Sequence, residues 1–276
     1  MSTITSNPSV SKNKIKPVAK AGFVAKGIVY CLLGALTFMA AFNINGQSTK
    51  ETGKGGVFDF LYQQTGGQIM LGILALGLVC YCIWRFVEAF SKKDTDKKSK
   101  KYIKTFRYIF SAVAYGVLAY RVIKKLISGI SSSSSDSGGN STQQNVAQEL
   151  LSKPFGQILV GIAAAILLGV GIYQIYYGYS EKYKKHVDKT VEKGRKIMLN
   201  SGKMGYIARG VVWLLLAWLF AKAAIDANAS KAGDTAKAFS YLKDVEYGPY
   251  LLAAVGFGLI CYGVFSFVRA RYEKFA

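Results

Sequence analysis

The sequence predicts an all-α, polytopic membrane protein in which six transmembrane helices form three parallel two-helix repeats around a pseudo-threefold axis. Three observations carry this prediction. Apolar stretches alternate with short polar segments, the polar segments alternate in charge, and the apolar stretches repeat one another in pairs. Short amphipathic helices are predicted before spans 2, 4 and 6.

The apolar stretches are each long enough to cross a hydrocarbon core of about 30 Å at about 1.5 Å per residue. They lie near residues 22–42, 68–90, 107–127, 157–179, 205–225 and 250–270. The formal net charge is +21, which in a soluble domain would suggest nucleic-acid binding. Because the charges fall between membrane-length stretches, nucleic acid is an unlikely partner.

The polar segments divide into basic and neutral ones. Counting Lys and Arg minus Asp and Glu, the net charge is +4 for residues 1–21, +5 for 91–106, +5 for 181–204 and +1 for 271–276. It is 0 for 43–67, −1 for 128–156 and −1 for 226–249. Cytoplasmic loops carry the excess of Lys and Arg, so we expect a multi-pass membrane protein with both termini and the linkers 91–106 and 181–204 in the cytoplasm. Its basic face would meet anionic lipid headgroups, which are the predicted partners.

The odd-numbered spans repeat one motif. GFVAKGIVYCLL, residues 22–33, recurs as GYIARGVVWLLL, residues 205–216, and aligns Lys26 with Arg209. The third span joins the same register less closely and has Ser111 at the cation position. The aromatic residues four positions further on are Tyr30, Tyr115 and Trp213.

The even-numbered spans repeat as well. Their sequences are GQIMLGILALGLVCYCIWRFVEAF (67–90), GQILVGIAAAILLGVGIYQIYYGY (156–179) and GPYLLAAVGFGLICYGVFSFVRARY (248–272). In this register Tyr81 has Val170 and Tyr262 as its counterparts. The chain thus divides into a basic segment (1–21), repeat 1 (22–90), a basic linker (91–106), repeat 2 (107–180), a second basic linker (181–204), repeat 3 (205–272) and a tail (273–276).

A short stretch with helical spacing precedes each even span, and we expect an interfacial helix ended by glycine. The residues expected on one apolar face are Phe58 with Leu61, Val146 with Leu150 and Leu151, and Phe239 with Leu242. A two-span unit returns the chain to the side it left. The three copies therefore share one orientation, as parallel repeats around an axis along the membrane normal do.

The motifs GFVAKGIVY, GYIARGVVW, PFGQILVG and LICYGVFSFVRARY resemble a bacterial family of six-helix integral membrane proteins. That family is catalogued as a domain of unknown function and consists of three tandem two-helix repeats. The resemblance covers nearly all of residues 20–275 and implies the fold and a location in the bacterial inner (plasma) membrane, but no activity. The departures are Ser111 in place of the cation and the long serine-rich loop at 128–142.

Lys26 and Arg209, with Ser111, are the candidate residues for binding a solute or anion. The three aromatic residues of the same motif, Tyr30, Tyr115 and Trp213, complete this candidate site. Four residues into a helix is a depth of only about 6 Å, so the cations could snorkel to the headgroups, and the sequence slightly favours this interpretation. Alternatively they face the axis, where two cations at one depth would need an anion between them.

Arg85 and Glu88 lie one helical turn apart near the predicted cytoplasmic end of the second span. An ion pair within that helix is the simpler interpretation. In the alternative, Glu88 pairs with Lys26 or Arg209 and forms an inner gate.

Catalytic motifs are absent, and we expect no enzyme, no metal site and no cofactor. The single histidine, His186, lies in a lysine-rich linker, and the four cysteines lack the spacing of a metal or redox motif. The leading hypothesis is a channel or carrier with a central path for an anionic solute, because the candidate inward groups are cationic. The alternative is a non-transporting structural or anionic-lipid-binding membrane protein.

Overall fold

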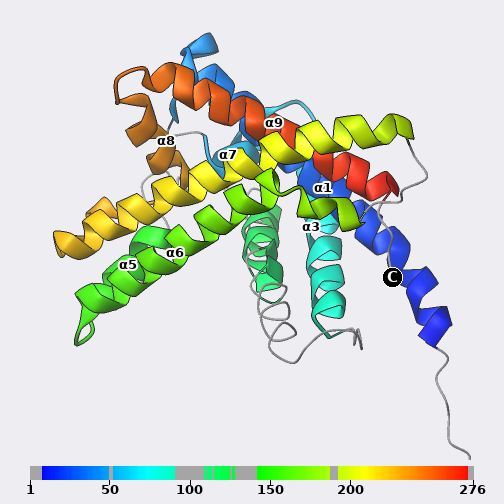
Figure 1. Ribbon diagram of the computed structural model, residues 1–276, viewed down its shortest axis with the longest axis horizontal. Helices are drawn as coiled ribbons and strands as arrows, with labels where there is room; N and C mark the ends of the chain where they lie inside the picture. Colours follow the sequence, from blue (N-terminus) through cyan, green and yellow to red (C-terminus); the bar gives the residue numbers. More distant parts are fainter. Residues whose placement is uncertain are drawn as a thin grey trace, which may run out of the picture.

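The computed structural model describes residues 8–49, 52–90, 109, 111–113, 115–124, 126–127, 142–186 and 192–272. Within these residues every regular element is a helix (Figure 1). The long helices are α1 (Pro8–Ala41), α3 (Gly67–Phe90), α6 (Gly156–Tyr179), α7 (Glu192–Ile225) and α9 (Gly248–Tyr272). The short ones are α2 (Lys54–Gln63), α5 (Thr142–Leu151), α8 (Thr235–Lys243) and the 3-10 turns η1 (Ile44–Gly46), η3 (Lys182–His186) and η4 (Ala229–Lys231).

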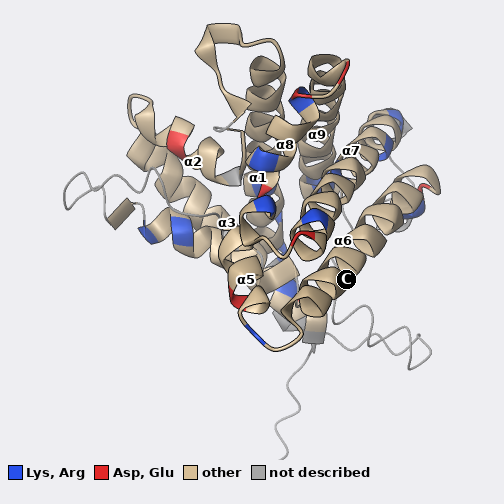
Figure 2. Ribbon diagram, turned by 90° about the vertical axis from the view of Figure 1, so that its left-hand side faces the viewer, with Lys and Arg blue, Asp and Glu red and all other residues tan. Residues whose placement is uncertain are grey.

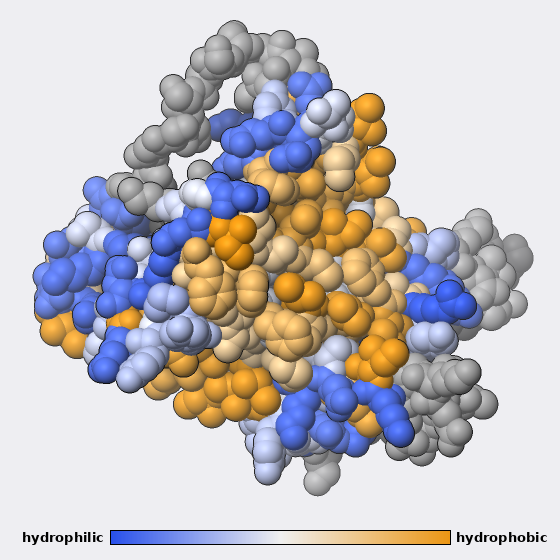
Figure 3. Space-filling view, turned by 90° about the horizontal axis from the view of Figure 1, so that it is seen from above, coloured by the Kyte–Doolittle hydropathy of each residue, from blue (hydrophilic) through white to orange (hydrophobic). Residues whose placement is uncertain are grey.

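Five helices in the described part of the chain are long and apolar enough to cross a membrane. Their spans are Lys16–Ala41, Gly67–Ala89, Gly156–Tyr179, Lys196–Ile225 and Gly248–Tyr272. The long helices are drawn mostly tan in Figure 2, the colour of residues other than Lys, Arg, Asp and Glu. In Figure 3 a broad hydrophobic face lies between hydrophilic edges. The protein is therefore a multi-pass, all-helical membrane protein.

The predicted third span, 107–127, lies partly outside the described residues. Its described residues between 109 and 127 are all helical, and they are called segment 109–127 below. The linker 91–106 and the serine-rich loop up to residue 141 also lie outside the described residues, as do 273–276.

Two long helices begin earlier than their apolar stretches. Helix α1 starts at Pro8 and α7 at Glu192, so parts of the basic segments 1–21 and 181–204 are helical rather than irregular. Lys, Arg and Glu are good helix formers, and a helix in water continues past the bilayer without leaving backbone groups unpaired.

Each even span begins with the same turn. A short helix ends, one residue adopts a left-handed conformation (Gly66, Phe155 and Tyr247), and a glycine starts the long helix. A Cβ on Gly67 would lie 2.0 Å from the Leu61 carbonyl oxygen, and one on Gly248 would lie 2.4 Å from that of Leu242. Only glycine permits this sharp approach, which explains why the turn into each even span ends in glycine, as GG, FG or YG.

The apolar faces of the short helices are largely as the periodicity predicts. Phe58, Leu61, Phe239 and Leu242 are buried. The prediction for Val146 is wrong, because its side chain is exposed and Ala147 is the residue buried at this end of α5. One position along a helix is a rotation of about 100°, enough to move a side chain from one face to the next.

The long helices form a chain of neighbours in which α6 packs on α7, α7 on α9, α9 on α1, and α1 on α3 (Figure 1). Segment 109–127 lies beside α3, where the Cys82 thiol donates to the Ala112 carbonyl at 3.2 Å. The first and third repeats are thus neighbours in space through α1 and α9.

Contacts between different repeats use the same positions each time. A Cβ on Gly263 would lie 2.8 Å from the Gly27 carbonyl oxygen, and a Cβ on Gly210 would lie 3.0 Å from that of Gly171. Cys82 and Ala112 occupy the corresponding positions of the remaining interface. Small residues that let two backbones approach closely are the usual means of packing helices in a membrane.

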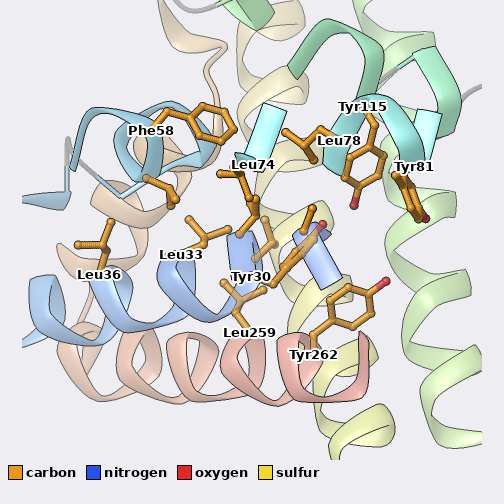
Figure 4. Close-up of a cluster of buried hydrophobic side chains, with 14 of the residues drawn as sticks. Tyr30, Leu33, Leu36, Phe58, Leu74, Leu78, Tyr81, Tyr115, Leu259 and Tyr262 are labelled. Carbon is orange, nitrogen blue, oxygen red and sulfur yellow. The ribbon is translucent and has the colours of Figure 1, made fainter. Parts of the chain in front are cut away.

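Aliphatic side chains fill the interior between α1, α3 and α9. Figure 4 shows Leu33 of α1, Leu74 and Leu78 of α3, and Leu259 of α9 packed against one another, and all four are buried. Tyr30, Tyr81, Tyr115 and Tyr262 extend into the same interior at one end of this leucine layer (Figure 4).

Candidate functional site

Lys26 is buried among tyrosines inside the helix bundle. The residue is only 4% exposed, and its ammonium donates to the Tyr81 hydroxyl at 3.1 Å. The same nitrogen lies 5.0 Å from the ring centroid of Tyr81, 5.5 Å from that of Tyr115 and 5.0 Å from that of Tyr262. These three rings come from the three repeats. The headgroup interpretation is therefore wrong for Lys26, which points inward.

Arg209 occupies the equivalent place in the third repeat. Its guanidinium donates to the Tyr262 hydroxyl, as Lys26 donates to Tyr81. The guanidinium carbon lies 4.4 Å from the centroid of the Tyr262 ring and 5.3 Å from that of Tyr30. Among the residues that the structure describes, none supplies Arg209 with a carboxylate partner.

The tyrosine rings pack directly on each other. Tyr30 meets Tyr262 with 4.7 Å between ring centroids, and Tyr81 meets Tyr115 at 4.6 Å, both edge to face. This is the preferred geometry for aromatic pairs, because it places a positive ring edge against a negative ring face. The rings therefore present electron-rich faces to the two cations.

Sequence reasoning identified the cations but missed the even-span tyrosines, Tyr81 and Tyr262, which accept their hydrogen bonds. The signal was present in the register of the repeats. Where Lys26 and Arg209 occur, the even span has tyrosine, and where Ser111 replaces the cation, Val170 replaces the tyrosine. The cation and its phenol are present together or absent together.

Ser111 and Trp213 take less part in this arrangement than the register predicts. Ser111 is half-buried on segment 109–127, and Trp213 is half-buried against the main hydrophobic core. Within the described residues neither contacts a cation. Lys26 lies over the rings of Tyr81, Tyr115 and Tyr262, and Arg209 lies over those of Tyr30 and Tyr262.

Arg85 and Glu88 form an ion pair within α3, with the nitrogen and oxygen 2.6 Å apart. Arg85 also donates through Nε to the Tyr81 hydroxyl at 2.9 Å. Tyr81 therefore accepts from both Lys26 and Arg85. The pair borders the site without neutralising it, because the carboxylate of Glu88 is already engaged by the arginine on its own helix.

A fourth cation lies beside this cluster. Arg269 of α9 is buried, and its guanidinium carbon lies 4.4 Å from the ring of Phe23. Phe23 packs on Tyr81 at 5.6 Å and on Trp84 at 4.9 Å. This end of the bundle thus combines the cations Lys26, Arg85, Arg209 and Arg269 with the carboxylate of Glu88.

Residues that could hold a metal ion are not grouped in the described part of the chain, where no cluster of three or more His, Cys, Asp and Glu occurs. The four cysteines are free thiols. What the cluster offers chemically is positive charge, phenol hydroxyls and aromatic faces, which suit an anion with polar oxygens.

Comparison with protein families gives a match to "Domain of Unknown Function (DUF1206)" three times along the chain, at residues 21–92, 106–181 and 204–273. The chain belongs to this family. The threefold tandem repeat inferred from the sequence is confirmed. As a member of DUF1206, the chain is also similar to the Uncharacterized protein YxxB of Bacillus subtilis (strain 168), with 24% identity over 266 residues that cover 95% of this chain and 93% of the relative. No solved structure matches.

Proposed function

We propose that this protein binds an anionic group between Lys26 and Arg209, at the cytoplasmic end of a six-helix bundle in the bacterial inner membrane. Segment 109–127 supplies the sixth span in this proposal. The alternation of basic and neutral segments supports cytoplasmic termini and cytoplasmic linkers at 91–106 and 181–204.

A pseudo-threefold arrangement of the repeats is part of the proposal. It is supported by the equivalent contacts between repeats, in which Gly27 with Gly263, Ala112 with Cys82, and Gly210 with Gly171 occupy matching positions. It is also supported by the ammonium of Lys26, which lies within reach of one tyrosine ring from every repeat.

One observation carries the proposed binding. Lys26 and Arg209 both lie over the ring of Tyr262, so a single phenol connects two interior cations. Burying a charge costs several kcal/mol, and a cation–π contact returns only about 2 kcal/mol when desolvated. The two cations also repel each other in a low-dielectric interior. An anion between them offsets both costs.

Packing supports binding more strongly than an open path. Tyr30 and Tyr115 are buried at the level of the cations, and the leucine layer of Leu33, Leu78 and Leu259 follows directly behind them. An apolar, filled layer excludes water and ions. The channel or carrier of the leading sequence hypothesis is the second candidate function, supported by the inward cations and the parallel repeats.

Retention of phosphatidylglycerol tests the proposal. The protein is purified from nanodiscs containing phosphatidylglycerol and phosphatidylcholine, and bound lipid is measured by native mass spectrometry. We expect the unmodified protein to retain phosphatidylglycerol and the Lys26→Gln/Arg209→Gln variant to retain at least about tenfold less, because each lost charge-assisted contact contributes about 1.5–3 kcal/mol.

Arg121→Gln/Lys222→Gln is the matched control, because it also removes one Arg and one Lys but away from the site. Equal loss of lipid in both double variants would refute a specific site. Anion efflux from proteoliposomes is measured in parallel, and we expect none. Efflux that depends on Lys26 and Arg209 would establish transport instead.

A further inference from the structure

We infer that the anionic group is the phosphate of a membrane lipid, which reaches the two cations laterally between segment 109–127 and α6. This inference rests on the proposed binding site and adds the route and the ligand. Its basis is a difference between the middle repeat and the other two.

In repeats 1 and 3 the two long helices are locked together by close glycine contacts. A Cβ on Gly77 would lie 2.4 Å from the Ala25 Cβ, and a Cβ on Gly258 would lie 2.4 Å from the Ala208 Cβ. One turn further along each even span, a Cβ on Gly22 would lie 2.6 Å from the Tyr81 Cα, and a Cβ on Gly205 would lie 2.6 Å from the Tyr262 Cα. Both helix pairs are therefore closed at the level of Lys26 and Arg209.

The middle repeat lacks every component of this lock. Larger or different residues stand at the equivalent positions, with Arg107 for the first glycine, Phe110 for the alanine, Ile166 for the second glycine and Val170 for the tyrosine. A β-branched isoleucine cannot occupy a position where even a single Cβ would meet its neighbour at 2.4 Å. The two helices of repeat 2 cannot approach as those of repeats 1 and 3 do.

Exposure along α6 agrees with an open side. Ile166 is 60% exposed, whereas its counterparts Gly77 and Gly258 are buried. Tyr173 is 45% exposed, whereas its counterparts are Trp84 at 7% and Phe265 at 1%. Ile166, Gly169 and Tyr173 are three and four residues apart and therefore share one face of α6, which we call the open stripe.

The open stripe lies at the depth of the cations. Val170 stands where Tyr81 and Tyr262 stand in the other repeats, and those tyrosines bind Lys26 and Arg209. Tyr115, which lies 5.5 Å from the Lys26 ammonium, belongs to segment 109–127, the other long helical segment of the same repeat. A molecule entering from the bilayer between these two helices therefore meets the cation site directly.

A phospholipid with an anionic headgroup matches both parts of this surface. Its phosphate complements the two cations, and its acyl chains suit the apolar open stripe, which faces the hydrocarbon core. A soluble anion would match only the cations, and a helix of another protein would match only the stripe. The combination of charge at one end and apolar surface along α6 favours the lipid.

Two glycines of α6 allow a matched test. A Cβ on Gly169 or on Gly161 meets no atom within 4 Å, so a larger side chain fits at both positions. Gly169 belongs to the open stripe at the level of the cations, whereas Gly161 lies about two turns away. In the nanodisc assay we expect Gly169→Phe to retain at least about tenfold less phosphatidylglycerol than the unmodified protein, and Gly161→Phe to retain the same amount.

The outcomes separate the route from the site. Unchanged retention in Gly169→Phe, with retention still lost in Lys26→Gln/Arg209→Gln, would overturn lateral entry and leave the proposed site standing. Ile166→Trp repeats the test at a side chain that is already exposed, should Gly169→Phe fail to fold. Binding of inorganic phosphate in preference to phosphatidylglycerol would equally overturn the inference. So would a stable dimer that Gly169→Phe or Ile166→Trp disrupts.

Discussion

The hydroxyl of Tyr262 accepts a hydrogen bond from the guanidinium of Arg209. The ring of the same residue lies 5.0 Å from the Lys26 ammonium. The hydroxyl therefore binds Arg209, whereas the ring lies beside both cations. Removing the oxygen while keeping the ring separates the two contributions.

We predict that Tyr262→Phe destabilises the protein by about 2 kcal/mol, because a hydrogen bond to a charged group contributes about 1.5–3 kcal/mol and its loss leaves buried donors unpaired. The ring contacts with Lys26 and Tyr30 remain. Thermal unfolding in detergent measures the effect, with Tyr250→Phe as the control at an exposed tyrosine. Equal unfolding temperatures for the two variants would contradict a structural role for the Tyr262 hydroxyl.

At the scale of elements, much of the helical arrangement follows from local sequence. The apolar spans, the short helices and the glycine turns depend on contacts between residues close together in the chain, and these the periodicity predicts. The inward position of Lys26 depends instead on Tyr81 and Tyr262, far away in sequence. The shallow position of Lys26 in its predicted span favoured a side chain that reaches the lipid headgroups, because a lysine near a helix end can reach them without any protein partner.

The turn η3 attaches the start of the second basic linker to the bundle through Tyr183. This residue is buried, its hydroxyl donates to the Leu199 carbonyl at 2.6 Å, and its ring packs on Phe265 at 5.3 Å. A Cβ on Gly202 would lie 2.7 Å from the ring. The glycine allows α7 to approach the turn.

Burial, helped by the nearby carboxylate of Glu181, raises the pKa of Tyr183 above its ordinary value of about 10. The neutral phenol is thus favoured in the folded state. The stability it contributes is fully present below pH about 10 and is lost as the pH rises through the folded-state pKa. We predict that Tyr183→Phe unfolds at a lower temperature at pH 7, by about 1 kcal/mol for the lost hydrogen bond, but loses less stability than the unmodified protein between pH 9 and 11.

Thermal unfolding across this pH range checks the prediction, with Tyr179→Phe at an exposed position as the control. Parallel pH profiles for Tyr183→Phe and the unmodified protein would mean that Tyr183 titrates normally. Its proposed role in fixing η3 against α7 would then rest on packing alone.

For the whole molecule, the repeats are not equivalent, and the sequence contains the reason. All three interfaces between different repeats have small residues at their close contacts. The close glycine–alanine contact between the two long helices of one repeat occurs only in repeats 1 and 3. Close packing on both sides would give a closed ring of helices. The bulky residues of the middle repeat, with Ile166 in place of a glycine, leave one side without that contact.

The orientation of the whole chain is testable at two serines in segments of opposite predicted location. In a variant whose four cysteines are replaced by alanine, Ser99→Cys probes the basic linker 91–106 and Ser135→Cys probes the neutral loop 128–156. Because an excess of Lys and Arg retains a loop in the cytoplasm, we predict that a membrane-impermeant maleimide applied to intact cells labels Ser135→Cys and leaves Ser99→Cys unlabelled until the cells are lysed. Six spans require this result, since segment 109–127 separates the two positions. Labelling of both cysteines in intact cells, or of neither, would mean that this segment does not cross the membrane, and repeat 2 would then enter the bilayer through α6 alone.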